Sequence, residues 1–177
     1  MTCSHILVMG VAGSGKTTVA TALARELGLE MIEGDAYHPE ANVEKMRAGI
    51  PLTDEDRRPW LQALAAILAD RHARGEGTVL ACSALRRTYR DVLRSTIPAD
   101  ELFEIELDVD PDMLRHRMGI RPGHFMPASL LDSQLATLEP LSQGEAGVTV
   151  DASRSLGEVL DDALASIRAW MELPNGP

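Results

Sequence analysis

The feature that most constrains this chain is a glycine-rich segment near its start. Residues 10–17 read Gly-Val-Ala-Gly-Ser-Gly-Lys-Thr, directly after an apolar run and before an amphipathic stretch. A Gly-x4-Gly-Lys-Thr pattern between a strand and a helix is typical of a loop whose backbone N–H groups and helix N-terminus bind nucleotide phosphates. The alternative is a glycine turn with a fortuitous lysine, and the flanking strand and helix argue against it.

The motif predicts the nucleotide contacts residue by residue. Lys16 is expected to reach the β- and γ-phosphates of ATP and to act in catalysis, and the Thr17 hydroxyl is expected to ligate Mg2+. The predicted nucleotide-binding residues are Gly10, Ala12, Gly13, Ser14, Gly15, Lys16, Thr17 and Thr18.

Short apolar runs alternate with longer amphipathic stretches in the rest of the chain. This pattern predicts an α/β fold, a P-loop NTPase type with a five-stranded parallel sheet and helices on both faces. The expected strands span 5–10, 30–33, 78–82, 102–107 and 147–150. Helices are expected over 16–27, ended by Gly28, over 54–73, capped by Thr53, from Asp110-Pro111 onward, and over 156–170. Residues 140–147 are expected to form a loose surface connection.

Length and charge limit the class of protein. A chain of 177 residues with 45% hydrophobic residues predicts a single domain over 1–177. The 27 acidic residues outnumber the 17 basic ones, and the net charge of −10 argues against nucleic acid and anionic membranes as partners. Cys3 and Cys82 form no disulfide framework, and no apolar run is long enough to span a membrane, so we expect a cytoplasmic protein.

Many classes of nucleotide-binding protein share the glycine-rich loop, so other segments must distinguish them. The chain has no Asn-Lys-x-Asp for reading guanine and no Asp-x-x-Gly switch, which argues against a GTPase. The strand expected at 78–82 ends in Cys82-Ser83 and lacks the acidic residue with which mechanical ATPases hold Mg2+. These two absences favour a small-molecule kinase among the classes that share the loop.

Asp35 is the candidate catalytic carboxylate. It follows the second expected strand, and ligands in open parallel sheets bind beyond the carboxyl ends of the strands, so Asp35 is expected across the cleft from the phosphate loop. There it could accept the proton of an acceptor hydroxyl and orient the oxygen toward the γ-phosphorus. An N-cap of a helix starting near Pro39 is the alternative, and the two roles are compatible.

Several longer motifs resemble the gluconokinase family. They are Gly34-Asp35-x-x-His38-Pro39, Asn42-x-x-Lys45-Met46, Gly49-x-Pro51-Leu52-Thr53-Asp54-x-Asp56-Arg57-x-Pro59-Trp60, Cys82-Ser83-Ala84-Leu85-Arg86-Arg87-x-Tyr89-Arg90-Asp91, Arg121-x-Gly123-His124-Phe125-Met126-Pro127 and Leu130-Leu131-x-Ser133-Gln134. The resemblance implies ATP-dependent phosphorylation of D-gluconate at its 6-hydroxyl, a fold like that of nucleoside-monophosphate kinases with a mobile lid, and a homodimer.

A sugar acid needs a cationic clamp for its carboxylate and hydrogen-bonding groups for its hydroxyls. The predicted substrate-binding residues, some from this requirement and some from the resemblance alone, are Asp35, His38, Arg57, Ser83, Arg86, Arg90, His124 and Gln134. Structural or surface roles remain open for His38 and His124, and a solvated first-turn role for Arg57. Arg94 is expected to be a solvated residue.

The lid is expected at about 115–128, where arginines lie among glycines and prolines. By resemblance, it would close over ATP and place Arg117 and Arg121 as catalytic cations against the transferring phosphoryl group. A solvated helix end is the alternative for this pair, and Gly119 could break the helix between them.

Two departures from the family pattern leave questions open. Arg86 and Arg87 stand where many relatives have a lysine pair, and Glu33 stands where relatives often carry Asp, so the part Glu33 plays is undecided. A shikimate-type or nucleotide-type kinase is the nearest competing function, since it shares the loop, the Asp and an arginine lid. A catalytically silent nucleotide-binding regulator is an alternative of another class.

Overall fold

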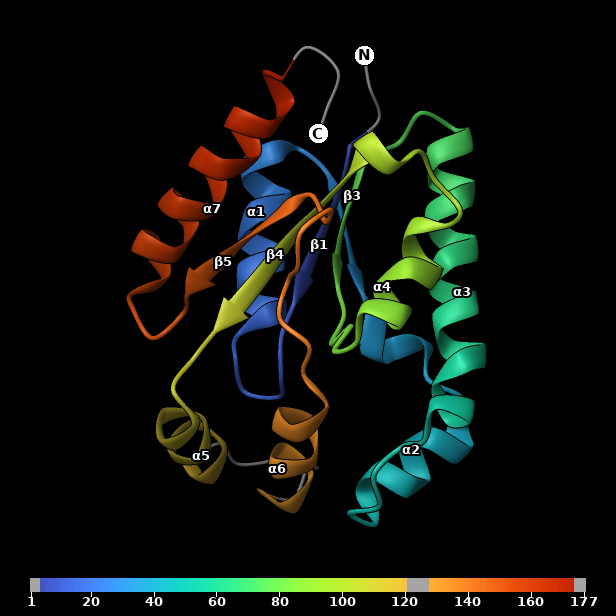
Figure 1. Cartoon of the computed structure of the whole chain (residues 1–177), viewed down its shortest axis with the longest axis vertical. Coiled ribbons are helices and arrows are strands. Elements are labelled where there is room, and N and C mark those ends of the chain that lie inside the picture. Colours follow the sequence, from blue (N-terminus) through green and yellow to red (C-terminus); the bar gives the residue numbers. More distant parts are fainter. Residues whose placement is uncertain (1–3, 121–127, 174–177) are drawn as a thin grey trace.

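The computed structural model describes residues 4–120 and 128–173, and it contains one five-stranded sheet. All strands are parallel and lie in the order β2-β3-β1-β4-β5 (Figure 1). The strands are β1 (His5–Met9), β2 (Glu30–Glu33), β3 (Thr78–Ala81), β4 (Leu102–Asp108) and β5 (Gly147–Asp151). The five predicted strands are therefore confirmed, with differences of one residue at some ends.

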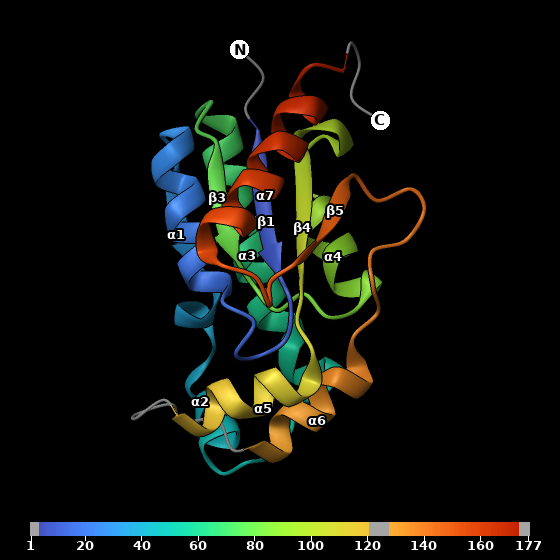
Figure 2. The ribbon, with the colours of Figure 1, turned by 90° about the vertical axis from the view of Figure 1, so that its left-hand side faces the viewer.

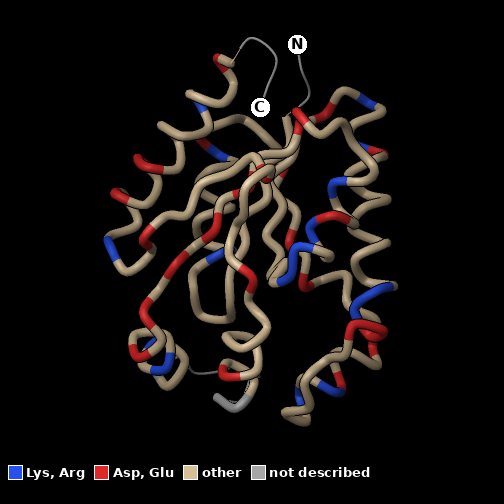
Figure 3. Tube along the Cα trace, in the orientation of Figure 1, with Lys and Arg blue, Asp and Glu red and all other residues tan. Residues whose placement is uncertain are grey.

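Helices cover both faces of the sheet, as predicted. α1 (Lys16–Leu27) and α7 (Leu156–Met171) lie on one face, and α3 (Asp54–Ala73) and α4 (Arg87–Arg94) lie on the other (Figure 1). Alternate residues of β1 point to opposite faces, so Ile6 and Val8 join the core under α1 and α7, while Leu7 and Met9 join the core under α3 and α4. Asp and Glu residues occur on helices of both faces (Figure 3).

Local sequence signals set the helix ends. Gly28 ends α1 in the left-handed conformation with φ 68°, as predicted. Thr53 begins α3 with a capping box, in which its hydroxyl accepts from Asp56 N–H and the Asp56 carboxylate accepts from Thr53 N–H. Ser155 and Glu158 begin α7 in the same way.

The remaining helices gather at the carboxyl ends of the strands. They are a 3₁₀ turn (Gly34–Tyr37), α2 (Glu40–Arg47), α5 (Pro111–Ile120) and α6 (Ala128–Thr137); α2, α5 and α6 lie together at the lower end of the molecule in Figure 2. A second 3₁₀ turn (Ala99–Glu101) precedes β4. No helix in the described ranges is long and apolar enough to cross a membrane. This end of the sheet holds the pocket described next.

Candidate functional site

A pocket opens at the carboxyl ends of β1, β2 and β3, between the phosphate loop and the start of α3. It brings together most of the predicted site residues, namely Ala12, Gly13, Gly15, Lys16, Thr17, Thr18, Asp35, His38, Arg57, Ser83 and Gln134. Apolar side chains from the segment after α2 and from α6, among them Ile50, Leu52 and Leu130, complete the wall. Polar groups that converge in an apolar-lined pocket are typical of a small-molecule site.

The phosphate loop has the conformation that its glycines allow. Gly13 and Gly15 have φ values of 79° and 98°, which other residues rarely adopt. At Gly10 a Cβ atom would lie 2.9 Å from Ser14 Oγ, so a larger residue at position 10 would collide with the Ser14 side chain. Gly10 and Ser14 belong to the loop but do not line the pocket.

The Lys16 ammonium folds back onto its own loop and donates to the Val11 carbonyl at 3.0 Å. Burial lowers the pKa of Lys16, and the nearby carboxylates, chiefly Asp35, oppose that shift. Gln134 has a role that its prediction as a substrate ligand did not include, since its Oε1 accepts from Ala12 N–H at 2.7 Å. A side chain of α6 thus holds the backbone of the phosphate loop.

Glu33, whose part the sequence leaves undecided, lies beside Thr17, the predicted magnesium ligand. The Thr17 hydroxyl donates to Glu33 Oε2 at 2.6 Å, and Glu33 Oε1 accepts from Asp35 N–H at 3.4 Å. A hydroxyl next to a carboxylate at a solvent-open rim is an all-oxygen donor set, which fits a hard cation such as Mg2+.

Asp35 and Lys16 line the same pocket, Asp35 from the 3₁₀ turn after β2 and Lys16 from the phosphate loop. The Asp35 side chain is 65% exposed, so its carboxylate is accessible from the pocket. The N-cap alternative for Asp35 is wrong: Pro39 is the N-cap of α2, and Glu33 caps the 3₁₀ turn that contains Asp35. The Asp35 carboxylate is therefore not committed to a helix end.

Two of the predicted arginines stand near the start of α3. Arg57 lines the pocket, with its guanidinium bonded to the Leu52 carbonyl and lying 5.5 Å from the centre of the Tyr89 ring. Arg86 pairs with Asp54 at 2.8 Å and does not line the pocket. Tyr89 links the two, because its hydroxyl donates to Asp54 and its ring lies under both guanidinium groups.

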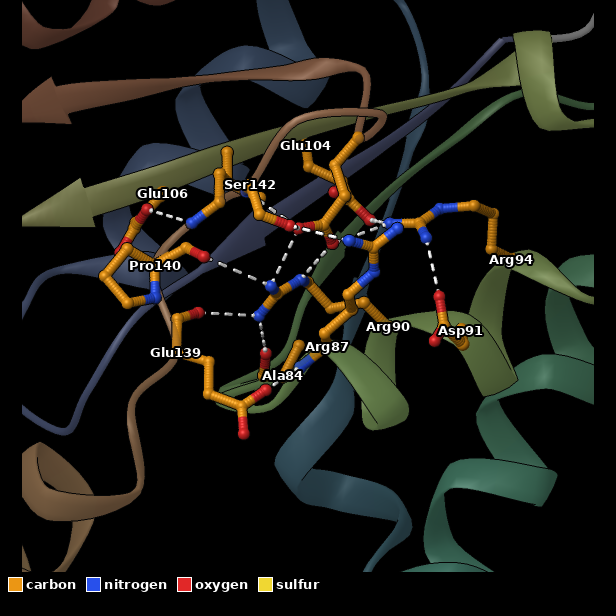
Figure 4. Close-up of polar contacts among 12 residues, drawn as sticks. Ala84, Arg87, Arg90, Asp91, Arg94, Glu104, Glu106, Glu139, Pro140 and Ser142 are labelled. Carbon is orange, nitrogen blue, oxygen red and sulfur yellow. Dashed lines mark hydrogen bonds and ion pairs between the residues drawn. The ribbon is translucent and has the colours of Figure 1, made fainter.

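The structure corrects the prediction that Arg90 contacts the substrate. Arg90 is fully buried; it pairs with Glu145 at 2.6 Å and also donates to the carbonyls of Ala84, Glu139 and Pro140 (Figure 4). Every one of these contacts is internal to the protein. Arg90 therefore connects the segment after α6, through the carbonyls of Glu139 and Pro140, with the turn after β3, through the carbonyl of Ala84.

Residues 140–147 form a surface connection as predicted, but the connection is not loose, and Arg94 is not solvated, because both take part in one buried charged cluster. The Arg94 side chain is only 16% exposed, and its guanidinium bonds to Glu104 and Glu145, so Arg94 is not a solvated residue (Figure 4). The side chain of Glu145 is fully buried. Burial alone would raise the pKa of Glu145, but hydrogen bonds led by that from Arg90 hold it well below the usual range. The connection from α6 to β5 is thus anchored to the fold.

The predicted lid residues are only partly described. Arg117 in α5 donates to the Ala152 carbonyl at 2.9 Å and does not line the pocket. Gly119 lies inside α5 and does not end it before Ile120. Arg121 and His124 lie outside the described residues, so their predicted roles stay predictions.

Sequence reasoning missed three residues on the acceptor side of the pocket: Trp60 lines the pocket, and Asn42 and Tyr89 contact residues that line it. These three, with His38 and Arg57, form what we call the acceptor wall. Trp60 Nε1 donates to the Gly34 carbonyl at 2.8 Å, and its ring stacks on His38 with centroids 4.0 Å apart. Asn42 contacts His38, and Tyr89 contacts Arg57. The available signal was that all three stand in the motifs quoted above, next to residues whose chemistry was easier to assign.

Comparisons with known proteins agree with this geometry. A family model described as "AAA domain" matches residues 6–141, and with the phosphate loop and its acceptor pocket this defines a P-loop kinase. A gluconokinase from Gluconobacter oxydans is 48% identical over 164 residues, covering 93% of this chain and 91% of that protein.

Two solved structures are similar throughout. A sugar kinase from Janibacter sp. superposes with a TM-score of 0.89 at 48% identity, covering 93% of this chain and 94% of the other. A gluconokinase from Sinorhizobium meliloti superposes with a TM-score of 0.86 at 46% identity, covering 95% and 93%. The chain belongs to the gluconokinase family.

Proposed function

We propose that this enzyme transfers the γ-phosphoryl group of ATP to the 6-hydroxyl of D-gluconate, giving 6-phospho-D-gluconate and ADP. The observation that carries the proposal is that Lys16 and Asp35 line one pocket, from the phosphate loop and the end of β2. Family membership supports the same substrate, because relatives of similar length carry the name gluconokinase. Phosphoryl transfer requires little beyond such placement and charge stabilisation.

In the proposed reaction, the substrate hydroxyl gives its proton to Asp35 while its oxygen bonds to the γ-phosphorus. The bond between that phosphorus and the bridging oxygen of ADP breaks, and the ADP oxygen keeps the electron pair. Lys16 neutralises the charge that develops on the phosphoryl oxygens. Asp35 then returns its proton to solvent, which its 65% exposed side chain permits.

Thr17 and Glu33 are the residues that would hold Mg2+. Magnesium, when bound with the nucleotide, draws negative charge from the β- and γ-phosphate oxygens. The short contact between the Thr17 hydroxyl and the Glu33 carboxylate, 2.6 Å, gathers oxygen ligands at the rim where the phosphates are expected. Glu33 carries this role in place of the shorter Asp of many relatives.

Arg57, Ser83 and His38 are the proposed ligands of the acid. They line the pocket on the acceptor side, with one cation for the carboxylate and two groups for the hydroxyls. Arg86 is 39% exposed and pairs with Asp54, so we assign it a supporting role at the mouth of the pocket. Arg117, Arg121 and His124 remain proposed lid residues within about 115–128.

A coupled assay of ADP release tests the substrate. D-gluconate, shikimate and nucleoside monophosphates are offered in parallel to the same protein with ATP and Mg2+. We expect turnover with gluconate alone. Turnover of shikimate without gluconate would favour the competing kinase, and ADP release that is indifferent to every acceptor would favour a nucleotide-binding regulator.

We also propose that the whole chain acts as one domain, in the cytoplasm and as a homodimer, on a small molecule only. The net charge of −10 supports the absence of nucleic acid and anionic membranes among its partners. Light scattering coupled to size-exclusion chromatography checks the dimer, and a mass equal to one chain would contradict it.

A further inference from the structure

The ring of His38 is held in one orientation on the acceptor side of the pocket. It stacks on Trp60 with centroids 4.0 Å apart and an interplanar angle of 18°, and its side chain is only 5% exposed. Its Nδ1 faces the amide of Asn42, and its Nε2 faces the carboxylate of Asp35. The two ring nitrogens therefore have different partners, which makes the position of the imidazole proton a defined property of the site.

Asn42 decides which nitrogen carries that proton. The amide Nδ2 of Asn42 lies 2.8 Å from the Asp56 carbonyl oxygen, which can only accept a hydrogen bond, so this end of the amide must be the NH2 group. The same nitrogen lies 3.4 Å from His38 Nδ1 and offers its second proton there. A ring nitrogen accepts a hydrogen bond through its lone pair, so Nδ1 carries no proton of its own.

The remaining proton of the neutral ring is then on Nε2. Burial lowers the pKa of His38, the Asp35 carboxylate opposes that shift, and Arg57 adds to it, so the neutral ring is the form present near pH 7. Nε2 lies 3.9 Å from Asp35 Oδ1, which is too far for a direct hydrogen bond. A donor and an acceptor at this separation can both contact one oxygen atom placed between them.

We propose that Asn42 is a positioning residue that keeps His38 in its Nε2–H form, so that His38 donates to the acceptor hydroxyl while this hydroxyl donates to Asp35. The inference rests on the proposed kinase function. A hydroxyl oxygen has one carbon, one proton and two lone pairs. While the hydroxyl donates its proton in a hydrogen bond to Asp35 and one lone pair accepts from His38 Nε2–H, a single lone pair is left to attack the γ-phosphorus, and its direction is fixed.

The ring form is measured directly by nitrogen NMR of the ligand-free protein labelled with 15N-histidine. We expect His38 to show a protonated-type shift at Nε2 and an unprotonated-type shift at Nδ1 near pH 7, assigned by comparison with His38→Gln. The reverse pattern, or a ring protonated on both nitrogens, would overturn the inference. Because this measurement needs no substrate, it decides the ring form even if gluconate is not turned over, an outcome that would count against the proposed function instead.

Asn42→Asp tests the catalytic consequence, because a carboxylate at this place accepts from Nδ1–H and moves the proton away from Nε2. We expect kcat to fall roughly tenfold or more, the loss of about one hydrogen bond to a reacting group, while the KM for ATP stays within about twofold. The shift pattern of His38 should reverse in the same variant at a pH high enough to keep the ring neutral, because a second carboxylate beside the ring raises its pKa. An unchanged kcat with a reversed pattern would overturn the role assigned to Nε2–H.

A double-mutant cycle separates this role from a loss of packing. In His38→Gln the side-chain amide can still offer a donor toward Asp35, and no ring proton exists for Asn42 to direct. We therefore expect Asn42→Asp to lower kcat by less than about twofold in the His38→Gln background. An equal loss of kcat in both backgrounds would show that Asn42 acts through the fold alone and would overturn the proposal.

Discussion

Lys16 and Asp35 reach one pocket because each follows a strand of the same parallel sheet. The carboxyl ends of β1 and β2 open at the same edge, so the residues that come next along the chain meet there. Their environments differ: Lys16 is half-buried and its desolvation lowers its pKa, while the Asp35 side chain is 65% exposed. Substitutions of the two residues are therefore expected to have different effects on phosphoryl transfer and on ATP affinity.

Lys16→Ala should abolish transfer, because it removes the cation that stabilises the charge of the transferring group. Asp35→Asn should lower kcat by roughly 10²–10⁴ while ATP affinity stays near that of the parent, since the change removes the proton acceptor and keeps the shape. Titration calorimetry with a non-hydrolysable ATP analogue, beside the turnover assay, separates the two effects. Equal losses of ATP affinity would contradict this division of labour.

The sequence identified the residues that carry distinctive local patterns, and it misjudged those whose partners are remote. The phosphate loop and Asp35 follow strands that could be read from apolar runs. Arg90 was assigned to the substrate because an arginine in a motif resembles a ligand. Its true partner, Glu145, stands 55 positions further along the chain. Burial of a charge depends on which distant residue comes to meet it, and no local pattern contains that information.

At the scale of elements, the first turn of α3 supports the acceptor wall. Asp56 closes the capping box with Thr53, pairs with Lys45 at 2.7 Å, and offers its carbonyl to Asn42. The hydrogen bond from Lys45, followed by that from Thr53 N–H, lowers the pKa of Asp56 to about 2. One turn of helix thus holds α2, and with it the residue that orients His38.

Thr53→Ala should cost about 1 kcal/mol of unfolding free energy, the usual loss for an N-cap. Because the same turn carries Asp56, we also expect the KM for gluconate to rise. Ser155→Ala, at the capping box of α7, is the matched control: its loss of stability should be similar and its KM unchanged. Urea unfolding and steady-state kinetics measure both quantities, and equal KM values in the two variants would refute the link between α3 and the acceptor wall.

Arg90→Met should destabilise the protein by roughly 3–5 kcal/mol, because it leaves the buried Glu145 without its main partner. Arg74→Ala is the control, since Arg74 forms an exposed pair with Asp70 and should cost less than about 1 kcal/mol. Chemical denaturation gives both values. A small loss for Arg90→Met would mean that the connection from α6 to β5 is held mainly by its other contacts.

At the scale of the whole molecule, the two ends of the sheet have different tasks. The carboxyl ends of the strands carry the pocket, and the opposite end carries a buried histidine, His5, whose Nδ1 bonds to the Thr78 hydroxyl at 2.9 Å. Burial, with a smaller contribution from His72, lowers the pKa of His5 to about 4. This group gives the fold a pH dependence that is separate from catalysis.

The free energy of unfolding should fall as the pH drops from about 6.5 to about 4. In that window the unfolded chain binds a proton at His5, whose ordinary pKa is 6.5, and the folded chain, with a pKa of about 4, does not. Below about 4 both states bind it and this contribution levels off. His5→Asn should flatten the slope and the exposed His116→Asn should not; denaturant titrations at several pH values compare them, and equal slopes in all three proteins would contradict the assignment.

The fold was predictable in outline because strands buried on both faces give short apolar runs between helix signals. The order of the strands was not predicted, since it depends on which faces pack together and not on any local run. The charged cluster of Arg90, Arg94, Glu104 and Glu145 was also not predicted, although it joins α4, β4 and the segment before β5 (Figure 4).

The bond from Ala12 N–H to Gln134 joins positions 122 residues apart, and it has a consequence for how the protein is made. During synthesis the glycine-rich segment leaves the ribosome before α6 does. Its bond to Gln134 can therefore form only after α6 has been synthesised and has docked.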